Sequence, residues 1–430
     1  MNIPGLRRFT FVFCLRPLIL WVALSTSAMG ANSYFVHNLL SDLPGVADQQ
    51  DYQLIDPWDF IAFNVCMPVG SPSCPPPDVS SVLIAANGYS TVTQYTPIPG
   101  VVEPESYPNL LPGVSGIMGM YGLPQQGTTG LAYGELMCTQ DGMILGLAVF
   151  SPTFVTTLID NSKSGAVYTG CTTASIPQGS GVEYYYAANF ASGRIDVWDA
   201  NLNPVNKAAA FVDPAIPQDF APFNIQSING QSLLVTYAQQ DVAKRNAVSG
   251  AGNGYIAAFD YNGSLVSTLV AQGPLNSPWG LTSAPATFGD FANVLLVGNV
   301  GDGRINAFDP ATGAWKGALA DAQGTPIAIQ GLHAINFGGG GPTGDVSTLY
   351  FTAGIAGPYG GPLGSHGLFG SIQAAPVYQA NSIRNGGDFS GAIAPNTWVT
   401  INGRFAFSYY PQLDHQRLHE SRSARNLERR

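Results

Sequence analysis

Two histidines have side chains that could bind a divalent metal. His333 lies within the apolar segment 331–335, and His366 lies in a glycine-rich loop. Imidazole nitrogens, together with Asp and Asn oxygens, can hold a divalent ion. The spacing of the two histidines is not diagnostic, however, and a histidine flanked by apolar residues is at least as often part of a core. A divalent metal is therefore a hypothesis, and apart from it we expect no cofactor.

A second group of polar side chains lies next to short apolar runs and could bind a polar ligand. The competing interpretation is that each Asp or Asn bonds the backbone of its own turn, which is common for these residue types. Both interpretations stay open for the whole group. Its members are Asp56, Asp59, Asn224, Asn276, Asn299, Asp302 and Arg304.

The longest polar insertion in the regular part of the chain covers residues 238–255. It places Asp241, Lys244 and Arg245 in an otherwise weakly charged region. Exposed loops held by a rigid scaffold often carry recognition residues. We expect this loop to contribute to ligand recognition, with a plain solvated loop as the alternative.

The motifs of common catalytic centres are missing from the sequence. There is no Gly-x-Ser-x-Gly nucleophile elbow. The glycines of segment 250–254 are followed neither by Lys-Ser/Thr nor by a helical pattern, so they do not form a phosphate-binding loop. We therefore expect no catalytic residue, which favours a binding protein over an enzyme.

Four cysteines follow the first thirty residues, and an even number in an exported chain favours disulfides. Cys66 and Cys74 bracket a short Pro-Gly-Ser loop, which predicts a bond between them. A second bond between Cys138 and Cys171 is expected, although spacing does not determine its pairing. No Cys-x-x-Cys spacing or adjacent histidine supports a metal site instead.

The elements that would position these residues show an internal repeat. The pattern Gly-x-Ile-x-x-aromatic-Asp occurs at 193–199, 254–260 and 303–309, after an apolar run each time. The glycine permits a hairpin turn, and the final Asp can begin the next turn. Intervals of this length are typical of propellers and solenoids. The Gly-Asp-Gly-Arg segment 301–304 is thus mainly a hairpin turn.

A Pro-aromatic segment precedes these hairpins and suggests the inner strand of a propeller blade. It occurs at 57–60, 222–225 and 278–281, with a degenerate copy at 331–335. The sequence therefore predicts an all-β fold, a six-bladed β-propeller of four-stranded blades. Residues 34–40 would close the ring against the last blade. The expected blades cover 57–95, a region centred on 136–148, 165–205, 220–269, 275–319 and 327–372.

Charge and hydropathy restrict the location and the partners. Residues 1–30 combine Arg7 and Arg8 with an apolar run and small residues, as in an export signal, which predicts a secreted or periplasmic protein. No later apolar run is long enough to span a membrane. Residues 31–380 contain 23 acidic and 7 basic residues, so we expect no nucleic-acid partner.

Many separate motifs, in order, resemble a family of exported bacterial proteins that has no established activity. They include LLSDLPG, GRIDVWDANLNPV, FAPFNIQSI, GPLNSPWGL, LLVGNVGDGRINAFDPATG and HGLFG, spread over residues 34–372. That family is similar to six-bladed propellers of the NHL type, so the resemblance implies an NHL-like fold for residues 34–375. The segments 66–77 and 120–130 depart from the family's usual text.

The last part, 376–430, changes character. Residues 381–405 resemble the opening of an immunoglobulin-like module, but the pattern ends after Phe407. Some 25 residues cannot bury a core, since even complete small domains are marginal. We expect this segment to be truncated or disordered.

Two functions follow as hypotheses. The first is a non-catalytic binding or adhesion platform, a monomer that recognises a glycan, a peptide or an envelope protein. The alternative is a metal-assisted hydrolase or lyase with its site at the mouth of the central channel, for which His333 and His366 would be ligands.

Overall fold

The structure is a computed structural model. It describes residues 33–64, 80–98, 101–104, 109–110, 114, 116–122, 133–148, 151–176, 183–205, 210–228, 230, 232–340, 344–375, 383–385 and 399–401. The predicted signal (1–30), Cys66, Cys74 and most of segment 376–430 lie outside these ranges. Within them, no helix has the length and apolar character that a membrane crossing requires.

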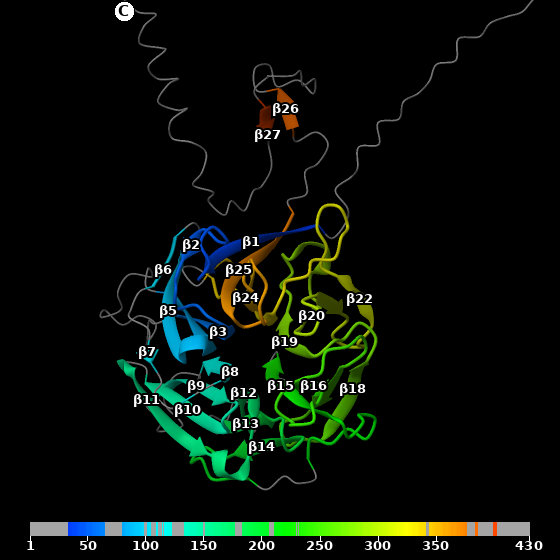
Figure 1. Cartoon of the computed structure of the whole chain (residues 1–430). Coiled ribbons are helices and arrows are strands. Elements are labelled where there is room, and N and C mark those ends of the chain that lie inside the picture. Colours follow the sequence, from blue (N-terminus) through cyan, green and yellow to red (C-terminus); the bar gives the residue numbers. More distant parts are fainter. Residues whose placement is uncertain are drawn as a thin grey trace, which may run out of the picture.

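Six antiparallel sheets are arranged around one axis, as the sequence predicted (Figure 1). In blade 1 the strands are β3 (Pro57–Asn64), β4 (Ser80–Ala86), β5 (Thr91–Ile98) and β6 (Val101–Pro104), with β7 (Asn109–Leu110) beside β5. Blade 2 contains β8 (Ile117–Gly122), β9 (Tyr133–Thr139), β10 (Met143–Ala148) and β11 (Ser151–Asp160). Blade 3 contains β12 (Tyr168–Ser175), β13 (Glu183–Asn189) and β14 (Arg194–Trp198).

The other three blades follow the same order. Blade 4 contains β15 (Phe220–Ile228), β16 (Ser232–Gln239), β17 (Tyr255–Phe259) and β18 (Leu265–Ala271). Blade 5 contains β19 (Pro278–Ser283), β20 (Leu295–Asn299), β21 (Ile305–Phe308) and β22 (Trp315–Ala318). Blade 6 combines β23 (Leu332–Phe337), β24 (Leu349–Ile355) and β25 (His366–Ala374) with β1 (Tyr34–Ser41), which also pairs with β2 (Gln49–Gln50).

Short elements complete the description. Three single 3-10 turns are η1 (Asn87–Tyr89), η2 (Ser162–Ser164) and η3 (Gly289–Phe291). Near the C-terminal end, β26 (Ile383–Asn385) pairs with β27 (Val399–Ile401). The described residues are thus almost entirely strands and turns.

The repeat prediction is confirmed. The three Gly-x-Ile-x-x-aromatic-Asp segments contribute β14, β17 and β21, each the third strand of its blade. Among the described residues, blade 3 has three strands where the sequence predicted four. Its described edge continues as an isolated bridge between Trp198 and Pro204.

One backbone bond repeats around the ring. The carbonyl of the residue before the inner strand accepts from the N–H of a residue at the end of the second strand or directly after it. In blade 4 the strands are longer, and the corresponding residues, Ala221 and Ala238, are paired within the sheet. The five other donor–acceptor pairs are Asn87–Asp56 (3.0 Å), Gln140–Gly116 (2.8 Å), Phe190–Val167 (2.8 Å), Val300–Ser277 (3.0 Å) and Gly354–Gly331 (2.9 Å).

The inner strands contact one another in chain order, β3, β8, β12, β15, β19 and β23, and β23 contacts β3 to close the ring. The N-terminal strand β1 completes blade 6 by pairing with β25 from Tyr34↔Ala374 to Ser41↔Leu368. The prediction that residues 34–40 close the ring is confirmed. Closure therefore joins strands more than 300 residues apart, so the first strand and the last blade of the propeller stabilise each other.

Tyr34 anchors this closing strand. Its side chain is 2% exposed, and its hydroxyl donates to Phe288 O and accepts from Phe291 N, each at 3.2 Å. The ring packs on Phe288 and Phe291, with centroids 4.9 and 5.9 Å away. The strand is thus fixed to blade 5 as well as to blade 6.

We expect Tyr34→Ala to lower the free energy of unfolding by about 3–5 kcal/mol, because it removes a buried ring. Urea denaturation measures the effect. Phe35→Ala is the matched control, since Phe35 is the next residue of the strand and is 47% exposed; it should cost less than about 1 kcal/mol. Equal losses in the two variants would contradict this account of ring closure.

Candidate functional site

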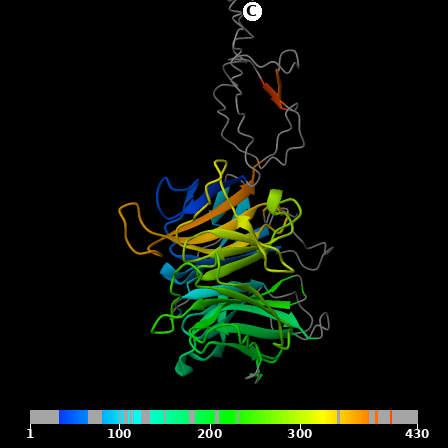
Figure 2. The ribbon, with the colours of Figure 1, turned by 90° about the vertical axis from the view of Figure 1, so that its right-hand side faces the viewer.

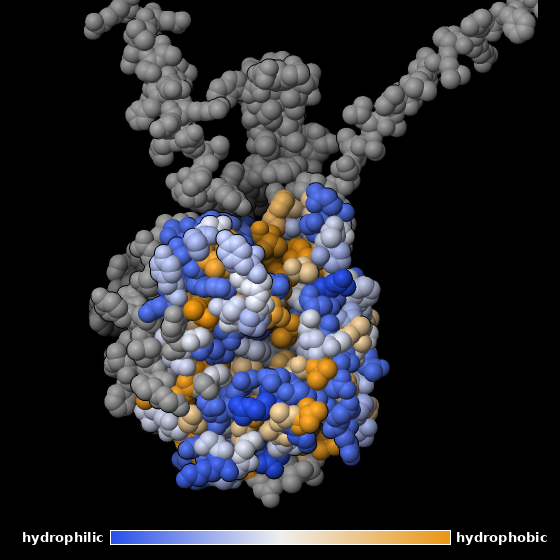
Figure 3. Space-filling view, in the orientation of Figure 1, coloured by the Kyte–Doolittle hydropathy of each residue, from blue (hydrophilic) through white to orange (hydrophobic). Residues whose placement is uncertain are grey.

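One face of the propeller collects the loops in front of the inner strands and the turns between second and third strands. Strand direction requires this, because the first strand leaves that face and the second returns to it. We call it the mouth face. The orange loop that projects to the left in Figure 2, residues 356–365, belongs to it. Figure 3 shows the mouth face, where hydrophilic and hydrophobic residues both surround a shallow central hollow.

Between blades 1 and 6, four side chains meet on this face: Asp56, Trp58, Asn87 and His333. We call this group the blade 1–6 site. The indole of Trp58 stacks on the imidazole of His333, with ring centroids 3.8 Å apart and planes 10° from parallel. Both residues lie at β-bulges, where Pro57 and Asp59 oppose consecutive residues of β4 and the β23–β24 register shifts between Leu332 and Ile335. A bulge adds one residue to a strand, which interrupts the alternation of side chains between the two faces of the sheet and redirects one of them.

His333 is held in one tautomer. Its Nδ1 lies 2.8 Å from the carbonyl oxygen of Pro57. A carbonyl can only accept, so Nδ1 carries the proton and Nε2 is left as an acceptor. Burial lowers the pKa of His333, which keeps the ring neutral near pH 7.

Asp56 supplies the negative charge of the site. Its backbone has φ 51° and occupies the entry position to the inner strand, where blades 2 and 6 have Gly116 and Gly331. The pKa of the Asp56 carboxyl is raised, chiefly by burial, and hydrogen bonds from the side chains of Asn87 and Trp58 offset part of that rise. Among the described residues, Asp56 forms no ion pair with a basic side chain.

Two glycines allow this crowding. A Cβ on Gly354 would overlap Asp56 Oδ1 and lie 2.9 Å from His333 Cε1, so both side chains rest against that glycine. A Cβ on Gly364 would lie 2.9 Å from Asp56 Oδ1. The 356–365 loop therefore borders the carboxylate directly.

Beneath the site, aromatic rings pack against one another. Trp58 meets Trp279 edge to face, with centroids 5.9 Å apart. The indole nitrogen of Trp279, in blade 5, donates to Thr169 O in blade 3 at 2.7 Å. These blades are not neighbours, so Trp279 connects two blades that blade 4 separates. A ligand at the mouth would have these aromatic rings beneath it.

Asp59 and Asn224 occupy equivalent positions in β3 and β15 and connect neighbouring blades. Asp59 accepts from Phe60 N at 2.8 Å and from Met120 N of blade 2 at 2.7 Å. Asn224 accepts from Ile225 N and donates to Trp279 O of blade 5, both at 2.8 Å. Both are buried, and their polar atoms are occupied by backbone. The structure thus places these two candidates within the propeller wall.

The Gly-Asp-Gly-Arg segment forms the turn that the sequence indicated. Asp302 Oδ1 accepts from Arg304 N and from Asn299 Nδ2, both at 3.1 Å. Asn299 Nδ2 also donates to Pro274 O at 2.9 Å, and Asn276 Oδ1 accepts from Gly250 N at 2.7 Å. These four candidates share the mouth face with the blade 1–6 site but mainly bond their own loops.

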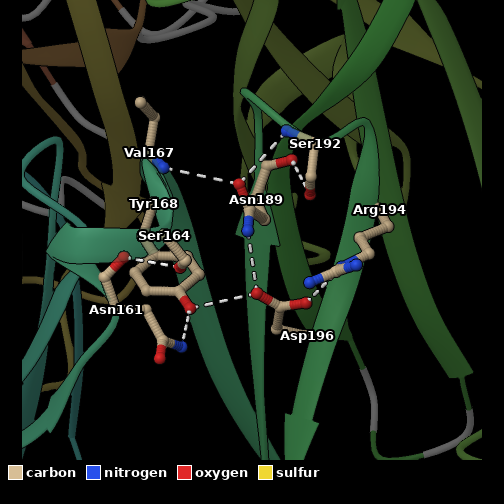
Figure 4. Close-up of polar contacts among 8 residues, drawn as sticks. All are labelled: Asn161, Ser164, Val167, Tyr168, Asn189, Ser192, Arg194 and Asp196. Carbon is tan, nitrogen blue, oxygen red and sulfur yellow. Dashed lines mark hydrogen bonds and ion pairs between the residues drawn. The ribbon is translucent and has the colours of Figure 1, made fainter. Parts of the chain in front are cut away.

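Blade 3 repeats the arrangement with a denser network (Figure 4). Asp196 accepts from Asn189 Nδ2 at 2.8 Å and from the hydroxyl of Tyr168 at 3.0 Å, and Arg194 Nε lies 2.7 Å from its other oxygen. Asn161 Nδ2 donates to the Tyr168 hydroxyl at 2.6 Å. Every charged group in the network has a partner within the blade, so it stabilises the hairpin.

The 238–255 loop is hydrogen-bonded both within itself and to blade 2 on the mouth face. Asp241 accepts from Arg245 N at 2.8 Å and from Asn246 Nδ2 at 3.1 Å. The Arg245 guanidinium donates to Gln140 O of blade 2 at 3.1 Å and lies 3.9 Å from Asp141. Lys244 adopts φ 57° at the tip of this turn. The loop thus spans blade 3 and forms part of the rim.

His366 has a partner of its own. Its Nδ1 lies 2.6 Å from Asp42, whose other oxygen accepts from Gly367 N at 2.8 Å. Asp42 follows β1, so this pair helps to fasten the N-terminal strand. No cluster of three His, Cys, Asp or Glu side chains suited to a metal occurs in the described ranges. The structure therefore does not bring His333 and His366 together as ligands of one such site.

The predicted disulfide between Cys138 and Cys171 is wrong, because both cysteines are free, buried thiols. They lie on β9 and β12 and donate to the same carbonyl, Gly119 O, at 3.6 and 3.7 Å. Each also packs in the apolar core between blades 2 and 3. They behave here as small apolar residues, which is common for free cysteine.

Sequence reasoning missed Trp58, Asn87 and Asp42. Trp58 was visible as the aromatic of a Pro-aromatic segment, which indicated an inner strand but not a place at the mouth. Asn87 and Asp42 lie in turns whose neighbours come from distant parts of the chain. Nothing in their local sequence could have singled them out.

Comparison with known proteins gives relatives without a stated activity. No family model matches the chain. Over 155 residues the chain is 39% identical to Uncharacterized protein R648 of Acanthamoeba polyphaga mimivirus, covering 35% of this chain and 38% of that protein. Over 234 residues it is 32% identical to Uncharacterized protein R640 of the same virus, covering 53% and 42%. The chain thus spans less than half the length of these relatives, and the expected bacterial, exported origin gains no support from them.

Solved structures with similar folds have low identity to this chain. Virginiamycin B lyase from Staphylococcus aureus is 11% identical with a TM-score of 0.43, covering 80% of this chain and all of that chain. A protein of unknown function from Bacteroides thetaiotaomicron is 8% identical with a TM-score of 0.46, covering 80% and 74%. We draw nothing about function from these similarities.

Asp59 makes stability depend on pH. Burial raises the pKa of its carboxyl to about 7, above the ~3.9 of an unfolded Asp. The folded state holds the proton more tightly, so the stability from this group is complete below about pH 4 and is lost as the pH rises to about 7. We expect the wild type to lose stability relative to Asp59→Asn as the pH rises over that range. Urea denaturation at each pH measures the two free energies of unfolding.

The matched control is Asn224→Ala, at the equivalent position of blade 4. It removes an inter-blade hydrogen bond but no titratable group, so its cost should stay constant between pH 4 and 8. A pH-independent difference for Asp59→Asn would contradict the assignment of a titrating carboxyl.

Proposed function

We propose that the protein is a non-catalytic binding platform whose ligand site is the blade 1–6 site on the mouth face. The observation that carries the proposal is the convergence of Asp56, Trp58 and His333, where a carboxylate without a basic partner adjoins a stacked aromatic pair. Small-molecule sites typically combine aromatic walls with a few oriented polar groups.

Exposed aromatic side chains beside the site support this proposal. Tyr52 is 72% exposed in the segment that leads into Asp56, and Tyr359 is fully exposed in the loop that borders it. Leu363, in the same loop, is 57% exposed. Exposed tyrosines next to a polar centre are common in recognition surfaces, because they add contact area at low entropic cost.

A binding role is favoured over metal-assisted catalysis. At the blade 1–6 site one nitrogen of His333 is occupied by Pro57 O, and Asp56 is the only carboxylate found among its four residues. His366 is paired with Asp42. We further propose a secreted or periplasmic location, on the basis of the signal pattern in residues 1–30.

The test is a panel of neutral and charged glycans and peptides, screened against purified protein and followed by calorimetry on each binder. We expect Tyr52→Ser and Tyr359→Ser each to weaken binding by roughly five- to tenfold, the scale of a moderate contact residue. Neither change should alter the melting temperature, since both rings are exposed.

Val266→Ser is the control, because Val266 is 64% exposed on the outer strand β18, away from the mouth face. Binding that survives both tyrosine changes but is lost in the control variant would place the ligand elsewhere and refute the proposal.

A further inference from the structure

We propose that the blade 1–6 site takes a protonated amine, an ammonium group that donates hydrogen bonds. This inference rests on the proposed function and adds the chemical class of the ligand. It follows from which polar atoms the site leaves available and from their charge.

The described polar atoms that remain for a ligand are acceptors. His333 Nε2 is an acceptor, because the ring proton is on Nδ1, which donates a hydrogen bond to Pro57 O. The donors of Asn87 and Trp58 are already directed at the Asp56 carboxylate. Asn87 Oδ1 is buried without a hydrogen-bond partner in the described structure, which adds an uncompensated carbonyl dipole. A donor-rich group complements such a site, whereas a carboxylate or phosphate would be repelled.

Asp56 lacks a compensating charge. A partly buried carboxylate is costly without a counter-ion. Its ordinary partners would be Lys or Arg, yet no described basic side chain pairs with it, and His333 is neutral because of burial. A ligand ammonium would supply the missing charge.

The indole of Trp58 favours the same ligand. Cations bind over the π faces of aromatic rings, most strongly over Trp. Trp58 is half-buried next to the carboxylate and stacks on a second ring. A carboxylate beside a tryptophan therefore offers an ammonium both an ion pair and a cation–π contact.

The surrounding face has the matching sign. In the described loops of the mouth face, carboxylates outnumber basic groups, and Arg245 is already engaged by Gln140 and Asp141. Such an excess attracts cationic ligands. The acidic residues are Asp42, which is paired with His366, and Asp51, Asp56, Asp141, Asp219, Asp241, Asp302 and Asp321; the basic ones are Lys163, Lys244, Arg245 and Arg304.

Two sources could supply this amine, an amino sugar or a lysine side chain. Calorimetry at neutral pH on the full chain should use two matched pairs of probes. One pair is a glucosamine trimer and its N-acetylated form, and the other is a lysine tripeptide and its Nε-acetylated form. We expect the protonated member of one pair to bind at least tenfold more tightly than its acetylated partner, and the pair that does so identifies the source.

Asp56→Asn tests the residue. It keeps the shape of the side chain and removes the charge, so binding of the protonated probe should weaken by roughly tenfold, or about 1.4 kcal/mol. Asp321→Asn is the matched control. It makes the same charge change in a surface turn of the mouth face, where Asp321 accepts from Gln323 N and Thr325 N, and it should change binding by less than about twofold.

Equal binding of protonated and acetylated probes, or equal effects of the two substitutions, would overturn the ammonium assignment. If the acetylated probes bind and depend on Tyr52 and Tyr359, the binding platform stands and only its ligand class is wrong. If neither protonated probe binds, the ammonium assignment falls, and the broader glycan and peptide panel alone decides the proposed function.

Discussion

The close approach of six inner strands to one axis is the constraint on which the rest of this structure depends. Where two neighbouring inner strands are in contact, a position has either a side chain that fits between the two backbones or a glycine. A Cβ on Gly280 would lie 2.9 Å from Ile335 Cγ1 and 3.0 Å from His333 O. A Cβ on Gly170 would overlap the Asn224 amide, which bridges to the next blade. The wall is thus built from glycines and from two bridging polar residues, Asp59 and Asn224.

The same constraint creates the candidate site. Three of the inner strands have a bulky side chain at their bulge, and these side chains contact one another: Trp58, Trp279 and His333. The indole N–H of Trp279 donates to Thr169 O and so links blade 5 to blade 3. Trp58 and His333 remain at the mouth, where Asp56 joins them because its carbonyl must receive the N–H of Asn87.

Ring closure and turn chemistry account for most of the other polar side chains. Asp42 and His366 fasten the first strand to the last blade, and Tyr34 fixes its beginning. Asp302, like Asp196 in blade 3, bonds within its own hairpin. A charged residue in a propeller loop is therefore more informative when its hydrogen bonds are incomplete. Asp56 meets this criterion, because no described basic side chain neutralises it.

The sequence by itself determined the architecture, because each blade is a local unit with its own turns, apolar runs and entry motif. The third-strand repeats, the inner strands marked by Pro-aromatic segments and the closing strand could all be read from neighbouring residues. It also listed Asp56 and His333 among its candidates. It could not group them, since Asp56, Trp58 and His333 come from opposite ends of the chain. Only the closed ring brings blade 1 against blade 6, and only there do burial and hydrogen-bond partners distinguish Asp56 from the Asp residues that bond within their own turns.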